Sequence, residues 1–91
     1  VMMGPEVFIL HSNHEFSDLS KPMCKQGSKP AKALVIEDDV WVGRQVIINP
    51  GRTIKKGSIV AAATVLVKDF PEYSIIGGNP SKLIGSRLDQ R

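Results

Sequence analysis

Two histidines stand three residues apart in the stretch HSNHEF, at His11 and His14. A neutral imidazole suits the removal of a proton from an alcohol, because its pKa lies near working pH. Two histidines can also begin a metal site, but no second cluster of ligating side chains supports one, so no metal is expected. On spacing alone, each histidine is more simply a solvated loop side chain. Their role therefore depends on the elements that hold this stretch.

The composition is that of an ordinary soluble protein with one small domain. The chain has 91 residues, of which 42% are hydrophobic and 23% are charged. The net charge of +3 is spread along the chain, which suits a small anionic ligand but is weak support for nucleic acid. The few aromatic side chains argue against a surface on which bases stack. No nucleic-acid partner is expected.

The single cysteine and the short apolar runs limit the setting of the protein. Cys24 cannot form an internal disulfide or a cysteine metal site, and it favours a reducing, cytoplasmic environment. No apolar run approaches the ~20 residues of a spanning helix, and no cleavable leader is visible, so no membrane span is expected. The chain opens at Val1 inside a patterned segment. We expect residues 1–91 to form one repeat domain that lacks its N-terminal part.

A six-residue repeat runs through the middle of the chain as IEDDVW, VGRQVI, INPGRT, IKKGSI, VAAATV and LVKDFP. The first position of each unit is aliphatic: Ile36, Val42, Ile48, Ile54, Val60 and Leu66. Helices favour apolar spacings of three and four, and lone strands favour alternation. A period of six is typical of a parallel β-helix, in which the aliphatic side chain points inward. The alternative is a small β-sandwich, but its turns recur about every 8–12 residues.

The fifth position of each unit is mostly small or β-branched, with one departure. Its residues are Val40, Val46, Arg52, Ser58, Thr64 and Phe70. Arg52 places a charged side chain where the others pack. Either its aliphatic stem lies along the edge of the core with the guanidinium in water, or its coil is locally distorted.

An excursion interrupts the repeat near its N-terminal end. The pattern extends back to Met3 and Ile9, but the distance from Ile9 to Ile36 is not a multiple of six. Residues 11–34 must therefore leave the coil as a loop. Their Ser, Pro, Lys and Gly content suits an exposed segment, and both histidines lie at its start.

The C-terminal segment, residues 71–91, is expected to cap the coil. Its first part predicts a short extended stretch with a double-glycine turn. The rest, NPSKLIGSRLDQ, predicts a helix, with Asn79 as the cap and Pro80 in the first turn. Leu83, Ile84 and Leu88 would form its apolar face. A terminal unit of different structure covers the open end of a solenoid, and a capping helix would do so.

Four ordered motifs, VWVG, NPGRTIK, AAATVLVKD and GNPSKLI, carry a resemblance that covers nearly the whole chain. The sequence resembles the C-terminal half of the hexapeptide-repeat acyltransferases. It is most similar to the branch with the maltose, galactoside and exopolysaccharide O-acetyltransferases. The resemblance implies a left-handed parallel β-helix, acetyl-CoA as the acyl donor, and a homotrimer with active sites between subunits.

The resemblance assigns the reacting groups to two positions. The family's catalytic histidine lies just before its looped excursion, and His14 matches that position, so His14 is the expected general base. His11 would only help to hold the loop. The backbone N–H of Arg44 matches a donor that the family offers to the thioester oxygen, a role that does not depend on the side chain.

The resemblance also suggests which residues hold the donor. Trp41 alternates with two valines and should point outward, where it is either interface packing or a wall of the ligand site. Ala62 and Ala63 match small residues that lie against the pantetheine arm. Lys68 and Lys82 match basic residues near the coenzyme A phosphates, although each could be an ordinary solvated lysine. No nucleotide-type glycine loop is present, so ATP is not the expected ligand.

Three classes of function remain open. The leading one is an acetyl-CoA-dependent O-acetyltransferase that acts on a hydroxyl of a sugar or polysaccharide. The second is the same scaffold with another acceptor, such as an amino sugar, serine or an antibiotic. The third is a non-catalytic structural β-helix; a zinc carbonic anhydrase would need three histidines, and the chain has two. The presence of a base at His14 separates the enzymes from the structural protein.

Overall fold

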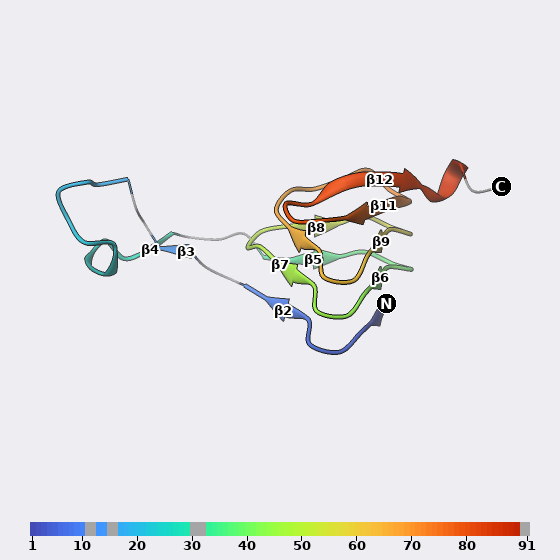
Figure 1. The fold of residues 1–91 in the computed structure, drawn as a ribbon, viewed down its shortest axis with the longest axis horizontal. Helices are drawn as coiled ribbons and strands as arrows, with labels where there is room; N and C mark the ends of the chain where they lie inside the picture. Colours follow the sequence, from blue (N-terminus) through green and yellow to red (C-terminus); the bar gives the residue numbers. More distant parts are fainter. Residues whose placement is uncertain (11–12, 15–16, 30–32, 90–91) are drawn as a thin grey trace.

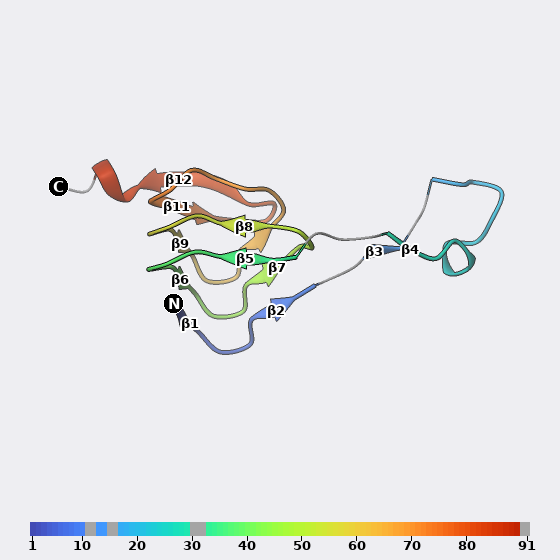
Figure 2. The ribbon, with the colours of Figure 1, turned by 180° about the vertical axis from the view of Figure 1, so that it is seen from behind.

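The chain folds into a three-sided coil of very short strands with one projecting arm (Figures 1 and 2). The computed structural model describes residues 1–10, 13–14, 17–29 and 33–89. The strands are β1 (Met2–Met3), β2 (Phe8–Ile9), β3 (Asn13–His14), β4 (Ser28–Lys29), β5 (Val35–Ile36), β6 (Trp41–Val42), β7 (Ile47–Ile48), β8 (Thr53–Ile54), β9 (Ile59–Val60), β10 (Val65–Leu66), β11 (Ser74–Gly77) and β12 (Lys82–Ser86). Two 3₁₀ turns complete the set: η1 (Met23–Lys25) and η2 (Arg87–Asp89).

Successive strands of the coil belong to different faces of a prism. The first face contains β1, β6, β9 and β11 in parallel, the second contains β2, β7 and β10, and the third contains β5 and β8. In the coils between the arm and β11, partners lie 18 residues apart, as Trp41 and Ile59 do. One coil is therefore three of the predicted six-residue units. Each unit places one strand on one face.

The inside of the prism is filled by the positions that the repeat predicts. Of the six first-position residues, five are buried and Ile36 is half-buried. The fifth position is buried too, except at Arg52, and includes the polar Ser58 and Thr64. The Thr64 hydroxyl donates a 2.7 Å hydrogen bond to the carbonyl oxygen of Ala61, so its burial leaves no polar atom unpaired. The repeat thus predicts the core correctly.

Removal of one of these inward side chains should destabilise the whole coil. Ile54 is 1% exposed, and Ile54→Ala should lower the free energy of unfolding by about 2–5 kcal/mol, because a cavity would remain between coils. Val35→Ala is the matched control, since Val35 faces outward on the same face and is 46% exposed. Denaturant unfolding of both variants at one protein concentration measures the difference. Equal losses would contradict the inward assignment.

Three rows of stacked turns form the corners of the prism. The groove corner, residues 4–6, 43–45 and 61–63, joins the first and second faces. The arm corner, residues 49–51 and 67–69, joins the second and third faces, and the remaining corner contains residues 37–39, 55–57 and 71–73. Most of these turns contain a residue with positive φ, such as Gln45 at 55° and Ala63 at 60°. Such a residue turns the chain sharply from one face to the next.

Residues 11–34 are called the arm, and its described residues 13–14 and 17–29 lie away from the coil, on the side of the arm corner (Figure 1). Its described part contains the antiparallel pair β3–β4 and the turn η1. Near the far end, the side-chain amide nitrogen (Nε2) of Gln26 donates to the backbone carbonyl oxygens of Asp18 and Lys21, at 2.8 and 2.7 Å. The Ser20 hydroxyl hydrogen-bonds to the Asp18 carboxylate and lowers the pKa of that group. Leu19 is almost fully exposed at this end.

The predicted C-terminal helix is wrong. Lys82–Ser86 forms strand β12, which pairs antiparallel with β11 at the C-terminal end of the first face (Figure 2). The open edge of β11 offers backbone partners along the whole segment, and Gly85 weakens a helix at its centre. Only η2 is helical there, and in the described part of the chain no helix is long and apolar enough to cross a membrane.

Candidate active site

A mainly apolar groove of about 500 Å³ lies along the groove corner. It crosses three coils and is lined by Gly4, Pro5, Trp41, Gly43, Arg44, Ile59, Val60, Ala61 and Ala62. Most of the turn residues that line it are small, while Trp41 and Ile59 form the wall on the first face. A groove of this length and character suits an extended, mostly apolar chain with few polar groups.

Glycine is required where the turns stack most closely. A Cβ at Gly43 would lie 2.7 Å from the amide nitrogen of Ala62, and one at Gly4 would lie 2.7 Å from that of Arg44. The turns are also joined by hydrogen bonds of 2.9 Å, from the amide of Ala63 to the carbonyl oxygen of Arg44 and from Gln45 to Pro5. The three turns therefore form one rigid floor.

Within the described part of the chain, one backbone donor of this floor, the Arg44 amide, lacks a partner. The amide of Arg44 has no hydrogen-bond partner among the described residues, although its neighbours Gly43 and Gln45 both donate to other coils. The Arg44 residue lines the groove and is exposed. An unpaired N–H in a mainly apolar groove can hydrogen-bond to a carbonyl oxygen and stabilise charge that develops on it.

Trp41 points outward, as the alternation predicts, and is 50% exposed. It lies opposite Met2 on one side and Ile59 on the other in the strand register of the first face. Its indole therefore has apolar neighbours and an open side. The position allows contact with a ligand in the groove and with another protein surface.

The structure groups three of the candidate residues and separates the others. Trp41, Arg44 and Ala62 line the groove together. Ala63 occupies the next turn position. Lys82 begins β12, and its side chain lies beside Gly78: the Lys82 Cε atom is 3.8 Å from the place that a Cβ of Gly78 would occupy. Lys68 is at the arm corner, with its Nζ 5.4 Å from the centre of the Phe70 ring. The groove of one chain therefore does not include Lys68.

His14 belongs to the arm. Its backbone pairs with Ser28 between β3 and β4, while His11 lies outside the described residues. The second face separates the arm corner from the groove corner, so a single chain keeps the two on different edges of the prism. No group of three or more His, Cys, Asp or Glu side chains that could hold a metal occurs in the described ranges.

Sequence reasoning missed several residues of the groove, namely Gly4, Pro5, Gly43, Ile59, Val60 and Ala61. The residues of the groove corner come from three coils, which lie far apart in sequence. A comparison of positions 18 apart would have found Ile59, because it follows Trp41 by one coil. Gly4 and Pro5 would have stayed hidden, since the arm adds residues between their coil and the next.

No protein-family model matches the chain, but individual relatives do. It is 43% identical over 63 residues to a chloramphenicol acetyltransferase from Agrobacterium fabrum, covering 69% of this chain and 30% of the relative. It is 36% identical over 80 residues to a galactoside O-acetyltransferase from Lactococcus lactis, covering 88% and 37%. The chain thus spans less than half the length of these relatives.

Solved structures give the same picture. A maltose O-acetyltransferase from Clostridium difficile 630 superposes with a TM-score of 0.81 at 32% identity, over 93% of this chain and 44% of that one. A hexapeptide-repeat acetyltransferase from Vibrio cholerae, solved with acetyl coenzyme A, gives 0.75 at 37% identity, over 91% and 44%. Sequence and fold agree that this chain is homologous to part of the hexapeptide-repeat acetyltransferases, the family of the maltose and galactoside O-acetyltransferases.

Proposed function

We propose that this chain forms the donor-binding part of an acetyl-CoA-dependent O-acetyltransferase that acts on a hydroxyl of a sugar or polysaccharide unit. The observation that carries the proposal is the groove with the Arg44 amide, which has no partner among the residues that the structure describes. Acetyl-CoA fits the residues present, because its pantetheine arm is extended and mostly apolar and its thioester carbonyl needs one donor. The relatives named for acetyl transfer support the same reaction class.

In this reaction, His14 and Arg44 act on different atoms. The His14 imidazole takes the proton of the acceptor hydroxyl as that oxygen forms its bond to the thioester carbonyl carbon. The Arg44 amide hydrogen-bonds to the carbonyl oxygen while it is negatively charged, which is worth about 3–4 kcal/mol for a preorganised donor. The carbon–sulfur bond then breaks, and the imidazolium returns the proton to the thiolate sulfur. The acceptor leaves as an acetyl ester.

The remaining candidates bind the donor. Trp41 and Ala62 contact the pantetheine arm within the groove, and Ala63 keeps the next turn position small. Lys82 lies near the end of the same corner and offers a positive charge to the phosphates. Lys68 is at the arm corner, so it reaches a phosphate only when the donor lies between two chains. We place the enzyme in the cytoplasm, where the exposed Cys24 thiol stays reduced.

We further propose that the coil is a left-handed β-helix that assembles as a homotrimer. Two neighbouring faces carry outward apolar rows: Met2, Trp41, Ile59 and Ile75 on the first, and Phe8, Ile47 and Val65 on the second. They flank the groove corner, and exposed apolar rows of this kind mark interfaces. A neighbouring chain packed on them can bring its own arm, with His14, to the groove.

The trimer has a direct test in solution. Light scattering on the full chain should give three times the chain mass, and Phe8→Lys, on an outward row at 57% exposure, should shift the mass toward the monomer. Val35→Lys is the matched control, because Val35 faces outward on the third face. The monomeric variant should also lose acetyl transfer. A folded, active monomer would exclude a site shared between chains.

The acceptor is the least constrained part of the proposal. The relatives are named for galactoside, maltose and chloramphenicol, so an antibiotic or another non-sugar hydroxyl or amine is the second candidate, and a purely structural coil is the third. Thiol release from acetyl-CoA, measured with a panel of sugars, serine, amino sugars and chloramphenicol, separates the three. Release with a sugar supports the first, and release only with another acceptor supports the second. No release with any acceptor would leave the structural coil.

A further inference from the structure

Arg52 breaks the pattern of the core at the corner from which the arm leaves. The corresponding positions one coil earlier and one coil later are Leu34, which packs against the core, and Phe70, which is buried. The Arg52 side chain is 28% exposed, so most of it lies against the protein. A position that holds hydrophobic side chains in the neighbouring coils thus holds a charged side chain that is only partly exposed.

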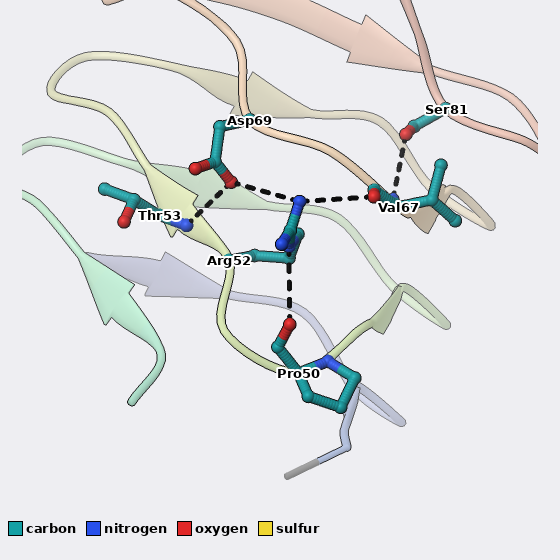
Figure 3. A network of polar contacts seen from close by, with 6 residues as sticks. All are labelled: Pro50, Arg52, Thr53, Val67, Asp69 and Ser81. Carbon is teal, nitrogen blue, oxygen red and sulfur yellow. Dashed lines mark hydrogen bonds and ion pairs between the residues drawn. The ribbon is translucent and has the colours of Figure 1, made fainter. Parts of the chain in front are cut away.

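Its guanidinium joins two successive coils (Figure 3). Nε donates to the carbonyl oxygen of Pro50 at 3.4 Å, and Nη1 donates to that of Val67 at 3.3 Å. Nη1 also lies 3.8 Å from a carboxylate oxygen of Asp69, which accepts a 2.9 Å hydrogen bond from the Thr53 amide. The same arginine therefore fixes the turn at residues 49–52 and ties it to the next coil.

This turn supports both ends of the arm. On the outgoing side, the Leu10 amide donates to the carbonyl oxygen of Ile48 at 2.9 Å. On the returning side, the Val35 amide donates to the carbonyl oxygen of Arg52 itself at 3.0 Å. The acceptors of the two anchoring bonds, Ile48 and Arg52, thus lie on either side of residues 49–51, so a shift of that turn would act on both bonds.

We propose that Arg52 is a positioning residue, which fixes the root of the arm and through it the place of His14. The inference rests on the proposed function, since it assigns His14 the role of base. Without the guanidinium, the Pro50 and Val67 carbonyls lose a shared donor and the turn between the two anchors is free to shift. A base displaced by about 1 Å can slow a reaction up to about 10²-fold, because proton transfer depends on its distance from the hydroxyl.

The kinetic test compares two arginines with similar contacts at different corners. Arg52→Ala in the full chain should lower kcat about 10–100-fold and leave the KM for acetyl-CoA within about twofold, well below the unfolding temperature. Arg52→Lys should recover part of the rate, because an ammonium still reaches one carbonyl oxygen. Arg87→Ala is the control: Arg87 Nη1 lies 2.7 Å from the Gly57 carbonyl oxygen and 3.4 Å from Asp39, away from the arm.

A second readout does not depend on activity. Amide hydrogen exchange followed by mass spectrometry should be faster in peptides of residues 13–29 in Arg52→Ala, but unchanged there in Arg87→Ala. Equal kcat losses in the two variants, or unchanged exchange in the arm, would overturn the proposal. If the parent chain transfers no acetyl group, the proposed function fails, while arm exchange still decides whether Arg52 fixes the arm. Should Arg52→Ala not fold, Arg52→Lys carries both measurements.

Discussion

The His14→Ala variant should transfer acetyl groups about 10²–10⁴-fold more slowly than the parent chain, because a positioned general base contributes a factor of that size. The loss should fall on kcat, since the imidazole acts on the acceptor proton and takes no part in holding the donor. No residue of the arm is among those that line the groove, so the affinity for acetyl-CoA should remain. Steady-state kinetics and equilibrium binding of acetyl-CoA measure the two quantities separately.

His11→Ala is the control for this experiment. It removes the same kind of side chain three residues earlier, and it should lower kcat far less. Near-normal turnover in His14→Ala would remove the base from the mechanism. A larger loss in His11→Ala than in His14→Ala would exchange the roles of the two histidines.

The coil was predictable from sequence because one geometric rule repeats in every unit. A residue at the first position of a unit, such as Ile48 or Val60, has no environment except the inside of the prism, and both are fully buried. Outward residues follow from the same rule, as Trp41 does. The six-residue period therefore predicts both whether a side chain is buried and whether it points inward or outward.

The C-terminal segment could not be predicted in the same way because its structure depends on a partner. Asn79 and Pro80 resemble the start of a helix, and Leu83 and Ile84 fit one helical face. The same two apolar residues also fit a strand, and β11 offers an unpaired edge beside them. Tertiary pairing with that edge decided between two structures that the local sequence allows.

Within one coil, the local sequence was enough to bring candidate residues together. Trp41 and Arg44 are close in sequence, so their common place in the groove follows from the strand and turn. Ala62 belongs to the next coil and joins them through the 18-residue spacing. Lys68 matches a residue that binds the acyl donor equally well, yet it lies at the arm corner, beside Phe70. Which corner a residue occupies depends on the number of residues per coil, which motifs do not reveal.

The Ala62→Trp variant should weaken acetyl-CoA binding at least about tenfold and leave the fold intact. Ala62 is exposed on the floor of the groove, so an indole would occupy space that the pantetheine arm needs without entering the core. A tenfold loss is about 1.4 kcal/mol, a small part of what an extended ligand gains from burial in a groove of about 500 Å³. The KM for acetyl-CoA and its directly measured affinity should change together.

The control is Glu72→Trp, which adds the same side chain at the equivalent, exposed turn position of the corner with residues 71–73. It should leave the affinity for acetyl-CoA unchanged, and both variants should unfold at nearly the parent temperature because neither position is part of the core. Normal acetyl-CoA affinity in Ala62→Trp would move the donor away from this groove. An equal loss in both variants would point to a general disturbance of the coil, and the groove would then no longer explain donor binding.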